Sequence, residues 1–156
     1  MTVNSENLVF MIHRTHDMLK SCEDKVFGEQ GLTTEQYAVL TAIKYLDGPV
    51  RITDVAHWLT RSTNSVSMIV DRMVKAGLLT RERDRKDRRE VRLIITSKAE
   101  TLLKPANLAG QEFIQKIQSQ LSYEDRQALL GLLLTVQYEA SEYLNPRGMV
   151  VILKNG

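Results

Sequence analysis

Residues 52–95 have the sequence ITDVAHWLTRSTNSVSMIVDRMVKAGLLTRERDRKDRREVRLII, and most of the information about the architecture lies in this stretch. It predicts a brief helix that Thr53 caps, with Asp54 at the positive end, followed by a polar break at residues 60–63. A second helix is expected from about Asn64 to Ala76, ended by Gly77, because four apolar residues recur at helical spacing: Val66, Ile69, Val70 and Met73. The stretch therefore begins with two helices joined by a tight polar turn.

A β-hairpin is expected directly after these helices. Residues 78–83 form its first strand and residues 91–95 its second, in which Val91, Leu93 and Ile95 alternate onto one face. The charged loop 84–90 lies between the strands. A short extended piece at residues 50–52 is expected to precede the first helix.

Longer helices are expected on both sides of this central stretch. Residues 5–27 repeat apolar side chains every three or four positions, and Thr33 with Gln36 forms a capping box for the next helix. Ser97 and Glu100 suggest a second capping box at the start of a long helix, which Pro105 should kink or interrupt. Ser122 caps a last, very apolar helix at about 123–144, and residues 145–156 have no role that we can assign. The fold class predicted is mainly α with a small β-hairpin (α+β).

Charge is distributed unevenly along the chain. Residues 51–92 hold 11 of the 21 Lys and Arg but only 6 of the 19 Asp and Glu, although the net charge of the whole chain is only +2. A basic segment inside a mildly acidic chain favours a polyanionic partner. We see neither a signal peptide nor a stretch that could span a membrane, so a soluble cytoplasmic protein is expected.

The two short helices have the form of a helix-turn-helix, which places the start of its second helix against base edges in the major groove of DNA. Small polar side chains suit that position, and the start of this helix carries several of them: Ser62, Thr63, Asn64, Ser65 and Ser67. Arg61 and Arg72 flank the unit and could hold the phosphate backbone. Taken alone, the serine-rich segment is equally well explained as an ordinary helix cap.

The hairpin loop carries the densest positive charge. Seven basic side chains fall within residues 81–92, and arginine at such a tip can enter a minor groove. The residues assigned to this contact are Arg85, Lys86, Asp87, Arg88 and Arg89. An aspartate two residues before an arginine, as Asp87 is before Arg89, can hold its guanidinium by hydrogen bonds and fix its direction. A solvated loop whose acids offset its bases is the alternative.

With these features together, the chain resembles the MarR family of winged helix-turn-helix regulators. Four stretches carry the resemblance, and they occur in the family's order and spacing: 32–40 (LTTEQYAVL), 52–56 (ITDVA), 70–79 (VDRMVKAGLL), and 87–89 (DRR) ahead of 94–96 (IIT). The resemblance covers nearly the whole chain, as far as about Leu144.

The resemblance implies a single MarR-like domain over residues 1–156 with a winged helix-turn-helix at 32–96. Helices within 5–28 and 97–144 would interlock with those of a second copy. The homodimer would bind double-stranded DNA at a pseudo-palindromic promoter site, as a repressor that a small aromatic or phenolic anion releases. Carried onto this sequence, the resemblance implies that Arg89, oriented by Asp87, enters the minor groove and that the base-contacting residues are Thr63, Asn64, Ser65, Ser67 and Met68. His13 and Arg14 would face the ligand cleft, and Tyr37 and Trp58 would line it or belong to the core.

Other functions have weaker support in the sequence. Cys22, the only cysteine, excludes an internal disulfide, and we expect a buried inert thiol rather than a redox sensor. His13 and His16 lack the further ligands of a metal site, so neither a metal nor another cofactor is expected. No catalytic motif supports an enzyme. A protein-interaction module would leave the arginine loop unexplained.

Overall fold

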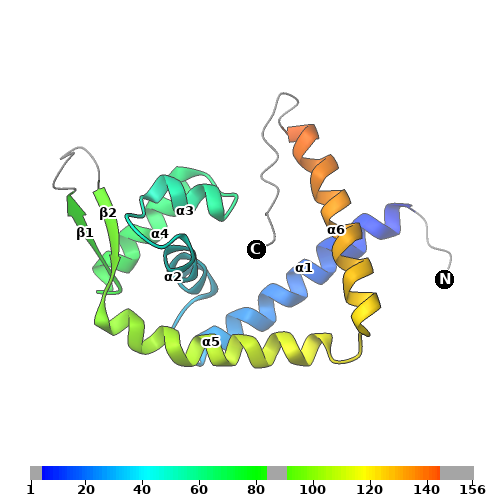
Figure 1. The fold of residues 1–156 in the computed structure, drawn as a ribbon, viewed down its shortest axis with the longest axis horizontal. Coiled ribbons are helices and arrows are strands. Elements are labelled where there is room, and N and C mark those ends of the chain that lie inside the picture. The colour runs from blue at the N-terminus through cyan, green and yellow to red at the C-terminus, as the bar shows by residue number, and fades with distance from the viewer. Residues whose placement is uncertain (1–4, 84–90, 145–156) are drawn as a thin grey trace. The chain divides into compact units, whose positions relative to one another are not determined.

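A computed structural model describes residues 5–83 and 91–144 of the chain (Figure 1). The chain divides into two compact units, Met1–Phe113 and Ile114–Gly156, which are described separately. The elements in chain order are α1 (Ser5–Gly28), α2 (Thr34–Leu46), α3 (Ile52–Trp58), α4 (Thr63–Lys75), β1 (Leu79–Arg83), β2 (Val91–Ile95), α5 (Ser97–Gln118) and α6 (Tyr123–Leu144). This is the mainly helical fold with one hairpin that the sequence predicts.

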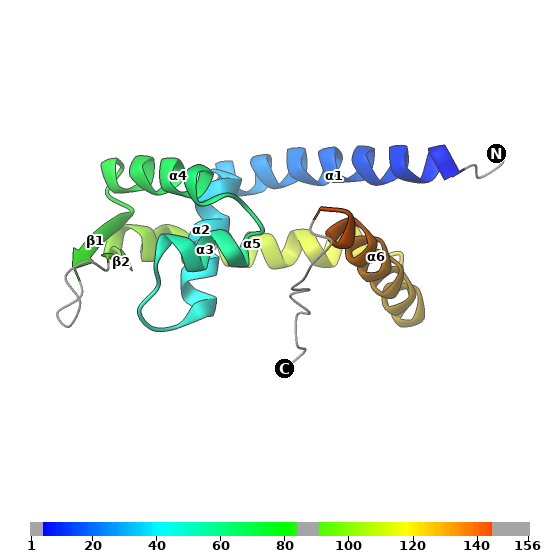
Figure 2. The same ribbon diagram turned by 90° about the horizontal axis from the view of Figure 1, so that it is seen from above.

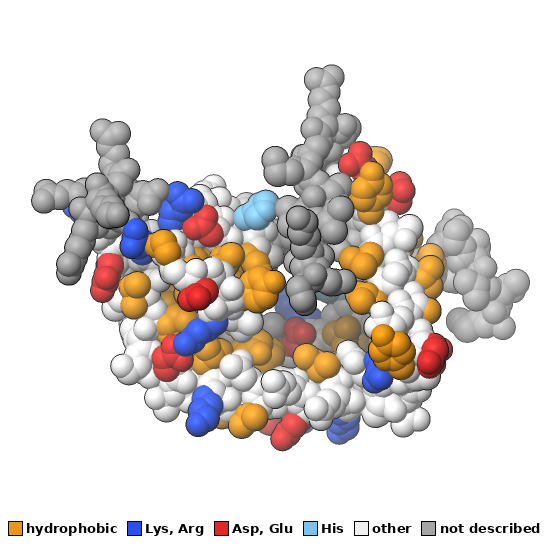
Figure 3. Space-filling view, in the orientation of Figure 1, with side chains coloured by type: hydrophobic (Ala, Val, Ile, Leu, Met, Phe, Trp, Pro, Cys, Tyr) orange, Lys and Arg blue, Asp and Glu red, His pale blue; other side chains and the backbone are white. Residues whose placement is uncertain are grey.

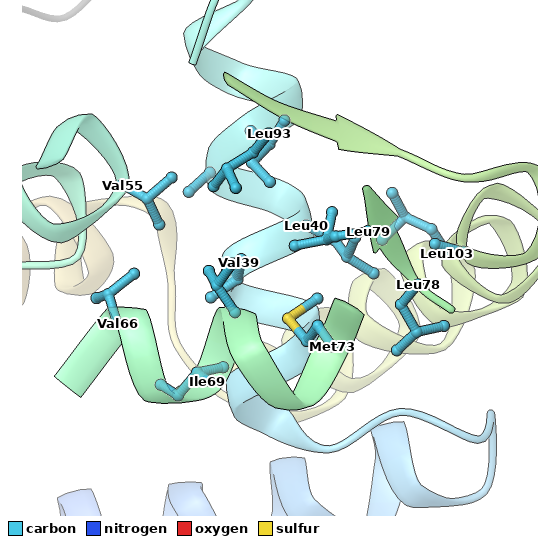
Figure 4. Packing of buried hydrophobic residues seen from close by; sticks show 14 of the residues in the cluster. Val39, Leu40, Val55, Val66, Ile69, Met73, Leu78, Leu79, Leu93 and Leu103 are labelled. Atoms are coloured by element: carbon cyan, nitrogen blue, oxygen red, sulfur yellow. The ribbon is translucent and has the colours of Figure 1, made fainter. Parts of the chain in front are cut away.

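The core of the first unit lies between α2, α4 and the hairpin, as Figure 4 shows. Leu40 of α2, Met73 of α4, and Leu79 and Leu93 of the hairpin are all buried to 2% exposure or less. Removing such side chains from water supplies roughly 1.5–3 kcal/mol each. This packing gives the helix-turn-helix a rigid base.

The helices α3 and α4 pack against each other (Figure 1 and Figure 2). The apolar stripe predicted for α4 faces the core. Val66, Ile69, Val70 and Met73 are all buried. Gly77 follows the end of α4 at φ 72°, a left-handed conformation that glycine adopts without strain. The Leu78 N–H donates to the Met73 carbonyl at 2.9 Å, which closes the helix end as a Schellman motif.

The hairpin forms from the two predicted strands, with the first strand beginning one residue later than expected, at Leu79. The strands β1 and β2 are antiparallel, with Leu79 opposite Ile95 and Arg83 opposite Val91. The backbone N–H of Leu93 also donates to the carbonyl of Val50 at 2.8 Å, so the segment before α3 is tied to the sheet. The extended piece is shorter than expected, because Ile52 already belongs to α3.

Three predictions about helix starts and interruptions were wrong. The residue that caps α3 is Arg51, not Thr53, because the Asp54 carboxylate reaches back to the Arg51 N–H at 2.8 Å. The cap of α5 is Thr96, not Ser97: the Thr96 hydroxyl oxygen accepts from the Ala99 N–H at 3.2 Å. Pro105 does not interrupt α5, which runs on to Gln118, because its neighbours Leu103 and Ala106 are buried in the core and offset the lost backbone bond.

In the second unit, α6 begins as predicted. The Ser122 hydroxyl accepts from the Asp125 N–H at 3.0 Å, and the Asp125 carboxylate accepts from the Ser122 N–H at 3.1 Å. None of the helices described in the two units has the length and hydrophobicity needed to cross a lipid bilayer.

Candidate nucleic-acid interface

The start of α4 is polar and open to solvent. Ser62 is the N-cap: its hydroxyl oxygen accepts from the Ser65 N–H at 3.2 Å and lies 2.8 Å from the Ser65 hydroxyl. Thr63 and Asn64 are exposed beside them. The first turn of α4 holds no acidic side chain, so the positive end of the helix is left uncompensated and suits an anion.

One outward face of α4 continues this polar end. With the apolar stripe turned into the core, Met68 lies on the exposed face at 65% exposure, while Ser67 is half-buried at the edge. The structure therefore brings five of the six predicted base-contacting residues onto the open surface of one helix and its cap. The serines serve both as a cap and as part of that surface.

The two arginines predicted to hold phosphate, Arg61 and Arg72, both pair with the carboxylate of Glu35, which the sequence analysis did not single out. Arg61 Nη1 is 3.5 Å from Glu35 Oε1, and Arg72 Nη2 is 3.6 Å from Glu35 Oε2. Glu35 belongs to the first turn of α2, and no spacing rule connects it to residues 26 and 37 positions later. The three charged side chains share a concavity of about 340 Å³ with Ser65, Met68 and Ile69.

A second ion pair joins α4 to the hairpin. Arg81 Nη2 of β1 lies 2.7 Å from Asp71 Oδ1 on α4. The far end of α4 is tied to α5 as well: Lys98 Nζ donates to the Ala76 carbonyl at 2.8 Å, and the Thr96 hydroxyl donates to the Gly77 carbonyl at 2.7 Å. The direction of α4 is thus fixed from both neighbouring elements.

The predicted minor-groove residues Arg85, Lys86, Asp87, Arg88 and Arg89 lie outside the described residues. The strands that lead to and from this loop are described, and their last pair is Arg83 with Val91. The loop therefore joins two paired strands next to α4.

The four residues expected at a ligand pocket do not come together. His13 and Arg14 line a concave patch of α1, together with five further residues of that helix: Phe10, Asp17, Met18, Ser21 and Cys22. Tyr37 instead stacks on Phe27 with ring centroids 3.8 Å apart, and Trp58 packs against Tyr45 at 5.6 Å.

The expectation of a buried Cys22 was wrong for the single chain. Its side chain is exposed and lines the concave patch of α1 together with His13 and Arg14. Within the described ranges, no group of three or more His, Cys, Asp or Glu side chains could hold a metal ion.

Comparison with known proteins gives matches in both sequence and fold. Residues 30–90 match a family model described as MarR family. The HTH-type transcriptional regulator MgrA of Staphylococcus aureus is 35% identical over 98 residues, which cover 62% of this chain and 66% of that protein. The match thus spans slightly less than two thirds of that relative's length.

Two solved structures share the fold. The organohalide sensing RdhR-CbdbA1625 transcriptional regulator, in its 2,4-dichlorophenol bound form, superposes with a TM-score of 0.82 at 20% identity, over 99% of this chain and 93% of that chain. The MepR–DNA complex of S. aureus gives a TM-score of 0.74 at 22% identity, over 88% and 96% of the two chains. At these identities the comparison speaks for the fold alone.

Proposed function

Because this chain belongs to the MarR family of winged-helix regulators, we propose that it regulates transcription by binding specific sites on double-stranded DNA as a homodimer. The observation that carries the proposal is the outward face of α4, an exposed run of small polar side chains at a helix end whose positive pole no acid offsets. Such an end fits the major groove, where side chains can donate to and accept from base edges.

Base recognition is assigned to the start of α4. Asn64 can bond to adenine in a bidentate way, and Thr63, Ser65 and Ser67 can donate to or accept from either base of a pair. Met68 offers an apolar contact to a thymine methyl group. Arg61 and Arg72 would bond to phosphates, which fixes the register on the duplex without reading the sequence.

The loop between β1 and β2 is assigned to the minor groove. Arg89, oriented by Asp87, is the proposed inserted side chain, and Arg85, Lys86 and Arg88 would add backbone contacts. The Asp71–Arg81 ion pair supports this arrangement, because it holds the hairpin against the helix that would occupy the neighbouring major groove.

Dimerisation is proposed from the apolar side chains of the outer helices. In the single chain, Leu8, Phe10 and Met18 of α1 are about half exposed or more, and so are Leu130 and Leu132 of α6. Patches of that kind usually mark an interface. A two-fold dimer would present two copies of α4 to successive major grooves, about ten base pairs apart.

Repression released by a small aromatic anion is proposed as the mode of control. One structural neighbour, the organohalide sensing RdhR-CbdbA1625 transcriptional regulator, has been solved in a form bound to 2,4-dichlorophenol. In this chain, Phe10, His13 and Arg14 line one patch of α1, which combines an aromatic ring with a permanent cation. A ligand that binds only the form released from DNA would lower the apparent DNA affinity and raise the melting temperature.

The test begins with selection of bound fragments from genomic DNA, followed by titration of a selected duplex in fluorescence anisotropy. Affinity should fall steeply with salt, because phosphate contacts release counterions. Arg89→Ala should lose most of the binding, whereas Arg126→Ala, which removes an exposed arginine of α6, should leave it unchanged. Equal affinities of the two variants would remove Arg89 from the interface.

Exposure of Cys22 favours thiol oxidation as a second means of control. In that case peroxide should weaken DNA binding by the wild type and have no effect on Cys22→Ser. If peroxide leaves the affinity of the wild type unchanged, redox control through this thiol is excluded.

A further inference from the structure

Glu35 places a negative charge among the residues that the proposed function assigns to DNA. Its two carboxylate oxygens face Arg61 and Arg72 at 3.5 and 3.6 Å, one oxygen to each guanidinium. The two arginines come from different parts of the helix-turn-helix, the turn before α4 and the last turn of α4. A single carboxylate of α2 thus bridges both proposed phosphate contacts.

These two ion pairs are loose. Charge-assisted hydrogen bonds between nitrogen and oxygen usually measure about 2.7–2.9 Å. The neighbouring Arg81–Asp71 pair reaches that range at 2.7 Å, whereas both contacts of Glu35 are much longer. The side chains of Glu35, Arg61 and Arg72 are 45%, 40% and 66% exposed, so solvent reaches all three. Pairs of this kind contribute little and can exchange for another anion.

The same concavity opens onto the base-contacting face. Ser65 and Met68 line it with the three charged residues, and so does the buried side chain of Ile69. A duplex bound along α4 therefore brings phosphates to within reach of both arginines, and at the same time close to Glu35. The carboxylate and the phosphate are both anions, so they compete for the same two guanidiniums.

We propose that Glu35 is a built-in competitor for the DNA backbone, which holds Arg61 and Arg72 in the free protein and must release them when a duplex binds. This inference rests on the proposed function. Because phosphates are the same in every sequence, the cost applies equally to specific and unrelated DNA. Glu35 thus lowers the affinity for all duplexes, and binding comes to depend more on the base contacts of α4.

The test compares Glu35→Gln with the wild type on a selected duplex and on an unrelated duplex of equal length. Glu35→Gln should bind both about three- to tenfold more tightly, as expected from the loss of two weak competing pairs. The ratio of the two affinities should stay the same. The plot of log affinity against log salt should become steeper by up to about one unit, because no freed carboxylate takes up a cation.

Two controls separate competition from a general change in charge or stability. Glu100→Gln makes the same change in net charge and removes a partner of Lys44, at 2.5 Å, outside the concavity that Glu35 lines. Its DNA affinity should equal that of the wild type. In a background of Arg61→Ala and Arg72→Ala, Glu35→Gln should have no effect. Thermal unfolding should confirm that each variant is folded.

Failure of the inference is distinct from failure of the proposed function. A wild-type protein that binds no duplex at low salt overturns both. If the wild type binds but Glu35→Gln binds equally or more weakly, Glu35 is not a competitor, and weaker binding would show that it prepares the arginines for phosphate. An effect that persists without the two arginines also overturns the inference.

Discussion

At the scale of single residues, Asp54 fixes the point where the helix-turn-helix begins. Its carboxylate accepts from the Arg51 N–H at 2.8 Å and from Arg51 Nε at 3.2 Å. Partial burial raises the pKa of Asp54, but the hydrogen bonds from Arg51 outweigh that effect, and the pKa lies below its ordinary value. The ionised form of Asp54 therefore stabilises the folded state.

The sign of the pH dependence follows from this lowered pKa. The stabilisation is fully present above the pKa of an unfolded aspartate, about 3.9, and is lost as the pH falls through the lower pKa of the folded state. Asp54→Asn should therefore reduce the free energy of unfolding at pH 7. As the pH is lowered, the free energy of unfolding should fall less in this variant than in the wild type. Urea unfolding at pH 7 and below pH 4 checks this. Parallel losses in wild type and variant would show that Asp54 does not stabilise the fold through its charge.

Sequence patterns located some of these residues and missed others. The Thr33–Gln36 capping box was predicted and is confirmed, because both partners lie within four residues. The cap of α3 was misplaced, since Arg51 supplies a backbone N–H and a guanidinium rather than a typical capping hydroxyl. Glu35 was missed because its partners depend on how α2 packs against α4, and spacing along the chain does not encode that contact.

At the scale of elements, α4 carries two methionines with opposite surroundings. Met73 is fully buried in the core, whereas Met68 is 65% exposed on the outward face. The apolar periodicity of the sequence predicted this difference, because Val66, Ile69, Val70 and Met73 define a stripe that excludes Met68.

Met73→Ala should lower the free energy of unfolding by about 2–5 kcal/mol, since it leaves a cavity between α4 and the hairpin. Met68→Ala is the matched control, with the same substitution in the same helix, and it should change stability by less than about 0.5 kcal/mol. If Met68 contacts a thymine methyl group, Met68→Ala should also reduce the preference for duplexes that carry thymine at one position. Equal destabilisation by the two substitutions would contradict the assigned faces.

The end of α4 depends on backbone conformation rather than on packing. Gly77 has φ 72°, and apart from the adjoining residues no atom lies within 4 Å of the place where a Cβ would stand. Gly77→Ala should therefore cost about 1–2 kcal/mol purely through left-handed strain. Gly28→Ala is the matched control, because Gly28 is equally uncrowded but has no positive φ. The free energy of unfolding of this variant should be unchanged or slightly higher than that of the wild type. Chemical denaturation of both variants distinguishes strain from a general effect of the methyl group.

The start and the course of α5 show where rules for single elements fail. Ser97 and Glu100 have the spacing of a capping box, but Thr96 takes the cap, because its hydroxyl also bonds to the carbonyls of Gly77 and Leu78. Glu100 instead pairs with Lys44 of α2. Contacts with residues far away in the sequence thus determine both which residue caps α5 and which residue Glu100 pairs with. Tertiary contacts also allow α5 to continue through Pro105.

At the scale of the whole molecule, the exposed apolar side chains bear on assembly. Figure 3 shows hydrophobic side chains open to solvent on the displayed face of α6. The leucines at positions 129, 130, 133 and 134 are 46–49% exposed in the single chain, and Leu132 is 67% exposed. The sequence predicted a very apolar last helix, but the positions of the apolar residues along the helix do not identify the surface that covers their side chains. A second copy of the chain is the occupant that the proposed function requires.

Placing a carboxylate in this surface should separate the two copies. Leu133→Asp would bury a charge in each half of a two-fold interface, and a buried unpaired carboxylate costs several kcal/mol, so the dimer should dissociate. Tyr45→Asp is the control: it places the same carboxylate at a 68% exposed position of α2, outside the outer helices, and should leave the assembly intact. Sedimentation velocity gives the mass of each variant, and circular dichroism confirms that the helices remain. Because one α4 alone reads only half of a pseudo-palindrome, the Leu133→Asp protein should also bind a selected duplex far more weakly than the wild type. A wild type that sediments as a monomer, or a Leu133→Asp dimer that binds DNA normally, would rule out this face as the dimer interface.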